Sequence, residues 1–188
     1  MVADPDLHLA RWTSTDVRRM VEAGIVTEPG RFELIDGLIL DKMSQNEPHR
    51  IALRLAQEAL RLAFAAEFSV IAGSPIALAE YDEPEPDVMV VPRGLRRDLL
   101  TSDVLLLVEV ADTSLRKDQT LKAALYARHG IPEYLILDVT NRRAEIRRRP
   151  QGEDWGETLI LTESGTFTPL GASGPLRVVD LLPDPEAL

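Results

Sequence analysis

The sequence predicts an α/β protein with a mixed β-sheet, and the order of three segments carries that prediction. Residues 104–110 form an almost entirely apolar run, which is typical of a central strand covered on both faces. A helical pattern follows over about 118–129, and Tyr134–Leu137 then resumes an extended pattern. Strand, helix and strand in this order form a crossover unit. The longest amphipathic helix is expected from Glu47 to about Phe68.

Local signals place the remaining elements. A capping box at Thr13–Asp16 starts a helix that runs to Gly24. Asp36-Gly37 suits the two left-handed positions of a type I′ hairpin turn. Further strands are expected over 32–35, 38–40, 68–72, 76–79, 88–91, 144–149 and 155–161, with strand and trailing loop over 176–182. We expect a loose leader over residues 1–12 and a single domain over 13–188.

Composition excludes several classes of protein. The chain has no cysteine, so disulfides and thiolate zinc sites are ruled out, and its three histidines are scattered. No apolar run approaches the roughly 20 residues of a membrane span. The first residues contain acids where a secretory signal needs a basic segment before an apolar one. We therefore expect a cytoplasmic protein with no membrane partner.

The charge distribution is uneven. A net charge of −10 opposes nucleic-acid binding, because phosphate contacts depend mainly on lysine and arginine. Five acids lie within residues 80–87, whereas five arginines lie within residues 142–149. Because local patches decide binding, the net charge weakens a nucleic-acid function without excluding it.

Two carboxylates stand at unusual places. The phosphate-binding glycine loops, the serine-hydrolase elbow and the HExxH zinc motif are all missing from the sequence. Asp87 follows Pro86 directly at the start of a strand, and Glu109 is the only charged residue in the apolar run 104–110. A buried carboxylate is costly unless it is paired or binds a cation. Asp87 could cap a loop and Glu109 could meet an arginine; alternatively, both could bind one Mg²⁺ or Mn²⁺ ion.

Lys122 is a third candidate residue. It follows Glu109 by 13 residues and lies one helical turn from Tyr126, beside an apolar helix face. Asp118 precedes it by four residues, so a surface ion pair along the helix would also explain it.

Six short segments, in chain order, resemble the pattern of the Uma2 family, which is often labelled putative restriction endonuclease. They are Phe32–Gly37, Met43-Ser44 with His49, Pro86–Val88, Val108–Val110, Lys122 with Tyr126, and Gly130–Tyr134. The resemblance covers residues 32 to about 148. It implies a PD-(D/E)XK nuclease-like core and a phosphodiesterase site that uses a divalent metal ion.

The resemblance also implies roles for individual residues. Asp87 matches the first acid of the motif and Glu109 the second, and together they would bind the Mg²⁺ or Mn²⁺ ion. The usual motif has a lysine two residues after the second acid, where this chain has Ala111. The family pattern instead points to Lys122 on the following helix as the catalytic lysine.

Two auxiliary positions also match the family. Glu33 could bind the metal ion through water, or it could be a half-exposed acid of the hairpin. His49 could contact phosphate or water, or it could be a polar residue near the start of the long helix.

Three functions are compatible with these features. The first is an endonuclease acting on nucleic acid, with DNA favoured, as a homodimer like other double-strand cutters of this fold. The second is a non-catalytic binding or regulatory module that retains the nuclease scaffold, which the net charge of −10 favours. The third is a glycosidase with paired carboxylates, which the aromatic content of 5% disfavours.

Overall fold

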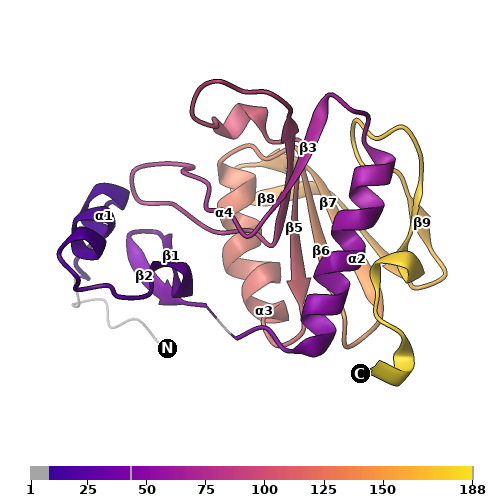
Figure 1. Ribbon diagram of the computed structural model, residues 1–188. Coiled ribbons are helices and arrows are strands. Elements are labelled where there is room, and N and C mark those ends of the chain that lie inside the picture. Colours follow the sequence, from indigo (N-terminus) through magenta and orange to yellow (C-terminus); the bar gives the residue numbers. More distant parts are fainter. Residues whose placement is uncertain (1–8, 43, 188) are drawn as a thin grey trace. The chain divides into compact units, whose positions relative to one another are not determined.

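The computed structural model describes residues 9–42 and 44–187 (Figure 1). The described chain divides into two units, one made of residues 9–42 and 77–84 and the other of residues 44–76 and 85–187. Most of the expected leader, residues 1–8, lies outside the described residues, as does Met43. The single domain over 13–188 stays a prediction.

The smaller unit contains one helix and one hairpin. Its elements are α1 (Ser14–Glu22), β1 (Phe32–Ile35) and β2 (Leu38–Asp41). The predicted capping box is confirmed, because Thr13 Oγ1 accepts a hydrogen bond from the Asp16 N–H and the Asp16 carboxylate accepts one from the Thr13 N–H. The I′ turn is also confirmed, since φ is 53° at Asp36 and 73° at Gly37.

A six-stranded mixed sheet forms the centre of the larger unit, in the order β3-β4-β5-β6-β7-β8. Its strands are β3 (Phe68–Ala72), β4 (Val88–Pro92), β5 (Leu106–Ala111), β6 (Glu133–Asp138), β7 (Arg143–Gln151) and β8 (Asp154–Thr162). β5 and β6 are parallel, whereas all the other neighbours are antiparallel. The predicted crossover unit and mixed sheet are therefore confirmed.

Helices cover both faces of this sheet (Figure 1). α2 (Glu47–Ala63) packs Ala52, Ala56 and Leu60 onto one face, against the alternate side chains of β4 and β5 that include Val88 and Val108. The crossover covers the opposite face and consists of α3 (Leu115–Lys117), a π-helical turn (Asp118–Lys122) and α4 (Ala123–Arg128). The side chain of Glu109 points to this second face, because alternate residues of a strand face opposite sides.

Three expected boundaries differ from the structure. The long helix ends at Ala63, because Phe64 adopts an extended backbone (ψ 139°) and its buried ring packs edge-on against Phe68. Residues 76–79 form no strand but only an isolated bridge from Ala79 to Asp82. The crossover helix begins at Leu115, before Asp118.

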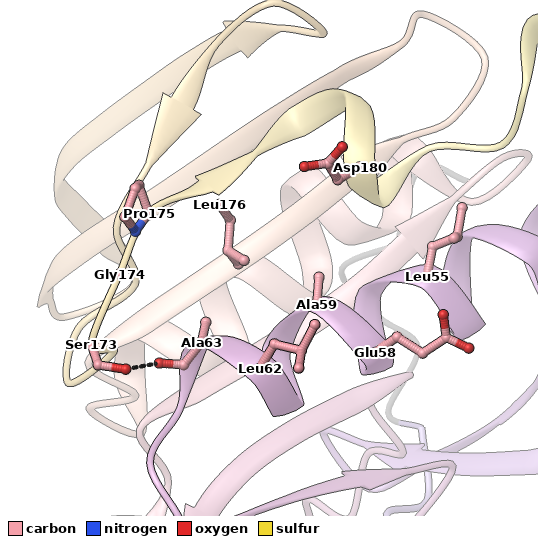
Figure 2. A pocket seen from close by; sticks show the side chains of 10 residues that line it. All are labelled: Leu55, Glu58, Ala59, Leu62, Ala63, Ser173, Gly174, Pro175, Leu176 and Asp180. Carbon is pink, nitrogen blue, oxygen red and sulfur yellow. Dashed lines mark hydrogen bonds between the residues drawn. The ribbon is translucent and has the colours of Figure 1, made fainter.

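The C-terminal segment returns to α2. It contains β9 (Thr166–Phe167), β10 (Leu176–Arg177) and the 3₁₀ turn Val178–Leu181; other 3₁₀ turns are Pro29–Arg31, Thr101–Asp103 and Pro185–Ala187. Ser173 donates hydrogen bonds from its backbone and side chain to the Ala63 carbonyl at the end of α2 (Figure 2). A cavity of about 460 Å³ lies between these segments, lined mainly by aliphatic groups with Glu58 and Asp180 as its only charged residues.

The five arginines of residues 142–149 are all paired with carboxylates. The pairs are Arg142–Glu163, Arg143–Asp138, Arg147–Glu145, Arg148–Glu133 and Arg149–Glu157. The partners come mainly from the neighbouring strands β6 and β8 and from the chain after β8. This arginine cluster is therefore electrically compensated and stabilises the sheet.

One of these pairs is deeply buried and should be essential for stability. The Glu133 side chain is fully buried and lies 2.6 Å from Arg148, and burial raises the pKa of Glu133. Arg148→Ala should cost about 3 kcal/mol of unfolding free energy in urea, because it leaves a buried carboxylate without its cation. Arg149→Ala is the matched control, since its side chain is 75% exposed and should cost less than about 1 kcal/mol. Equal losses in the two variants would contradict this account.

Candidate active site

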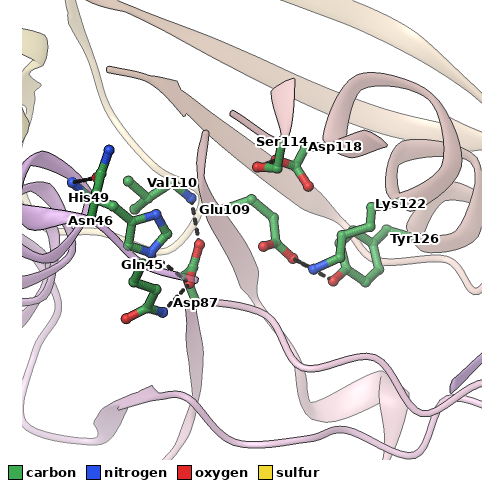
Figure 3. A network of polar contacts seen from close by, with 10 residues as sticks. All are labelled: Gln45, Asn46, His49, Asp87, Glu109, Val110, Ser114, Asp118, Lys122 and Tyr126. Carbon is green, nitrogen blue, oxygen red and sulfur yellow. Dashed lines mark hydrogen bonds and ion pairs between the residues drawn. The ribbon is translucent and has the colours of Figure 1, made fainter. Parts of the chain in front are cut away.

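Asp87 and Glu109 lie opposite each other on neighbouring strands. β4 and β5 are antiparallel with Val88 paired to Val108, so extending the register by one residue brings Asp87 opposite Glu109. Directly opposed residues of an antiparallel pair place their side chains on the same face. Figure 3 shows both carboxyl groups on the same side of these strands. The sheet register therefore brings together the two acids that the sequence singled out.

Asp87 directly precedes β4 and is held there by three neighbours. Its Oδ2 accepts a hydrogen bond of 2.7 Å from the backbone N–H of Val110, one residue after Glu109. Its Oδ1 lies 3.3 Å from Nε2 of His49, in the first turn of α2, and 3.5 Å from Nε2 of Gln45, which precedes that helix (Figure 3). The Asp87 side chain remains 14% exposed. One carboxyl oxygen is thus fixed by the backbone, and the other faces longer and weaker contacts.

Glu109 is the buried centre of the site. It is 4% exposed, and its Oε1 accepts hydrogen bonds from Lys122 Nζ at 2.7 Å and from Tyr126 Oη at 2.8 Å. Lys122 is 3% exposed and Asp118 1% exposed, so any pairing between them is buried and is not the surface pair that the sequence left open. Glu109 is therefore paired with a lysine from the crossover helix.

Asp118 is a further site residue that sequence reasoning assigned only to an ion pair. It is 1% exposed, accepts a hydrogen bond from Ser114 Oγ, and begins the π-helical turn that ends at Lys122. Burial raises its pKa, and the nearby Asp87 carboxylate adds to that effect, while Lys122 and Ser114 oppose it. π-Helical turns are uncommon and are often found at functional sites, but no sequence signal of this chain pointed to one.

The site has an excess of negative charge. Glu109, Asp118 and Asp87 all raise the pKa of the buried Tyr134 hydroxyl, although burial is the larger cause. The three carboxylates therefore act on one region, in which Lys122 is the buried cation. Such an excess is costly in a poorly solvated site unless a cation or protons offset it.

The remaining candidate positions are placed as follows. Glu33 belongs to the smaller unit and is 3% exposed, so it is not the half-exposed hairpin acid considered above. Asp87, Glu109, Lys122 and His49 all belong to the larger unit. Ala111, which occupies the usual lysine position of the motif, is buried in β5. Lys122 reaches the second acid from the helix that covers the same face.

The donor set suits a hard divalent cation. Within residues 9–42 and 44–187, no group of three or more His, Cys, Asp or Glu side chains is arranged to hold a metal ion. Mg²⁺ usually binds to only one or two carboxylates and completes its shell with waters and substrate phosphate oxygens. Asp87 and Glu109, from adjacent strands, fit this requirement.

A solved structure shares the fold that carries these residues. The crystal structure of a putative nuclease belonging to DUF820 from Anabaena variabilis ATCC 29413 matches this fold with a TM-score of 0.63, at 15% identity, over 80% of this chain and 88% of that one. The chain therefore has a nuclease fold, as its sequence predicted. No curated protein sequence is significantly similar to it.

A family model identifies the chain more closely. The model of Uma2, described as putative restriction endonuclease, matches residues 17–174. The chain belongs to the Uma2 family.

None of the helices in the described part of the chain is long and apolar enough to cross a membrane.

The raised pKa of Asp118 predicts a pH-dependent effect of its removal. The folded state holds the Asp118 proton more tightly than the unfolded state, so the carboxyl costs stability above its ordinary pKa of about 4 and costs nothing well below it. Asp118→Asn should therefore stabilise the protein at pH 7, and the gain should shrink as the pH falls toward about 4. Urea unfolding of both proteins across this range measures the difference. A loss of stability at pH 7 would mean that attraction to Lys122 outweighs the cost of burial.

Proposed function

We propose that this protein is a metal-dependent endonuclease that hydrolyses phosphodiester bonds of a nucleic acid, with DNA as the favoured substrate. The observation that carries the proposal is the buried contact of 2.7 Å between Lys122 Nζ and Glu109 Oε1, opposite Asp87. Two acids and a lysine in this relation match the parts that the nuclease motif requires. Membership of the Uma2 family supports the same function.

Asp87 and Glu109 would hold Mg²⁺ or Mn²⁺ between them. The ion, when bound, would polarise the scissile phosphate and lower the pKa of an attacking water. Asp87 is oriented for this task by the Val110 N–H, and Glu109 by Tyr126 Oη. Both acids are thus held in place by groups outside the pair, which limits the reorganisation needed on binding.

Lys122 would supply the fixed positive charge of the site. Its ammonium group is nearly excluded from solvent and lies beside Glu109. In that position it would orient the attacking water and stabilise the negative charge that develops on the phosphate. His49, beside Asp87 Oδ1, would contact the phosphate or a water at the more exposed side of the site.

The alternative function is a binding or regulatory module that has kept the scaffold without cleavage. The net charge of −10 and the pairing of all five arginines of residues 142–149 favour it. It differs from the first function in needing neither a metal ion nor Lys122.

The expected homodimer and the cytoplasmic location stay predictions. Light scattering of the purified protein would test the homodimer.

Metal binding should stabilise the folded protein. At 100 times its dissociation constant, a bound ion adds about 2.7 kcal/mol, which corresponds to a rise of several degrees in Tm for a chain of this size. Asp87→Asn should remove this Mg²⁺-dependent rise while preserving the Lys122–Glu109 pair. Thermal melts with and without Mg²⁺ measure it. A variant that is stabilised as much as the wild type would exclude Asp87 as a ligand.

Cleavage of supercoiled plasmid tests the proposed chemistry. Lys122→Met should slow metal-dependent cleavage on the order of 10²-fold or more, because a preorganised charge is lost, yet it should retain the Mg²⁺-dependent rise in Tm. Arg128→Met, on the same crossover and paired to a largely exposed Glu153, is the control and should cleave normally. Asp87→Ala should be inactive. If the wild type binds the ion but never cleaves, the non-catalytic alternative stands.

A further inference from the structure

The arginines of α2 differ from the other clustered arginines of the larger unit. The side chains of Arg50 and Arg61 make no hydrogen bond or ion pair with any described residue, and that of Arg54 makes only one, with Glu58 at 3.2 Å. Both partners of that pair are more than half exposed, so the pair is weak and readily exchanged. In a protein of net charge −10, uncompensated arginines mark where an anion would be attracted.

These three residues form a stripe along one side of the helix. At about 100° per residue, Arg50, Arg54 and Arg61 fall within an arc of about 40°. The residues that α2 buries, Ala52, Ala56, Leu60 and Ala63, lie on the opposite side. The α2 arginine stripe (Arg50, Arg54 and Arg61) is therefore directed to solvent and is about 16 Å long, from 11 residues at 1.5 Å each.

One end of the stripe adjoins the candidate active site. Arg50 directly follows His49, whose ring lies 3.3 Å from Asp87. At the other end, Arg61 lines a cavity of about 410 Å³ together with Arg93, Phe68 and Ser69. Arg93 also makes no side-chain ion pair with any described residue. The α2 arginine stripe thus runs from the residue after His49 to the end of α2, where Arg61 and Arg93 line the same cavity.

We propose that the α2 arginine stripe and Arg93 bind the phosphate backbone of the nucleic acid beside the site of cleavage. The choice of a nucleic acid as the ligand rests on the proposed function. The position and charge of the surface follow from the structure alone. A stripe of about 16 Å matches about five base pairs of duplex, at 3.4 Å for each phosphate of one strand. Arg54 would exchange Glu58 for a phosphate on binding, and Arg61 and Arg93 would hold one further along.

Fluorescence anisotropy with a labelled 30-base-pair DNA duplex tests the surface in EDTA, where no cation supports cleavage. Arg50→Gln with Arg61→Gln should weaken binding on the order of tenfold. It should also reduce the slope of log affinity against log salt by about 1.8, because two phosphate contacts are lost at about 0.9 each. Circular dichroism verifies that the variant is folded.

The matched control carries the same change of charge elsewhere. Arg18→Gln with Arg19→Gln alters two exposed arginines of α1 and should bind the duplex like the wild type. Equal affinities for the two double variants, or no binding by the wild type, would overturn the proposal. Single-stranded DNA and duplex RNA of equal length serve as further ligands, and the one whose binding depends most on Arg50 and Arg61 is the polymer that the stripe fits.

Asp87→Ala separates this surface from the proposed activity. In EDTA it should bind the duplex as well as the wild type or better, because a carboxylate near the path of the phosphates is removed. Binding that depends on the stripe, in a protein that never cleaves, would reject the nuclease function and keep this surface. If the double variant Arg50→Gln with Arg61→Gln cleaves and binds DNA like the wild type, the nuclease function is kept and this surface is rejected.

Discussion

The candidate site depends on one buried ion pair between a central strand and the helix that crosses over it. Glu109 and Lys122 are 4% and 3% exposed and meet at 2.7 Å. Neither charge would be tolerated alone in such surroundings, since breaking a buried pair typically costs 3–5 kcal/mol. Their mutual attraction, with a second hydrogen bond from Tyr126, fixes the crossover helix over the face of β5 that carries the acid. The sheet then determines the position of the other acid, because its register sets Asp87 opposite Glu109.

The same protein uses its other charges in a different way. Within residues 142–149, each arginine is paired with a carboxylate, so these ion pairs stabilise the sheet and leave little unpaired charge at its surface. Near Glu109, three carboxylates lie around the buried Lys122, and a divalent cation would offset part of their negative charge. Along α2, exposed arginines lack strong partners. The net charge of −10 therefore does not predict the local charge of any of these three regions. Whether a region attracts an anion or a cation depends on which of its charges are paired.

Much of this arrangement could be predicted from the sequence, because it rests on patterns along the chain. The run before Glu109 identified a central strand, the crossover made β5 and β6 parallel, and both acids stood out against apolar neighbours. The burial of Asp118 could not be predicted, since a polar stretch of helix looks the same whether it faces water or a site. The pairing of residues 142–149 was also hidden, because partners such as Glu133 and Glu163 are distant in sequence and become neighbours only through the sheet.

The π-helical turn over Asp118–Lys122 sets the direction in which the Lys122 side chain points. Asp118, Lys122 and Tyr126 follow at intervals of four, and all three are buried. In a regular α-helix these intervals would rotate the third side chain about 80° from the first. A wider turn over Asp118–Lys122 reduces that rotation and keeps the three groups aligned. The winding of the crossover helix therefore positions Lys122. In the usual motif, the lysine is instead placed by its position two residues after the acid on the same strand. Loss of one residue between Asp118 and Lys122 would turn the ammonium group away while the strand and both acids stayed in place.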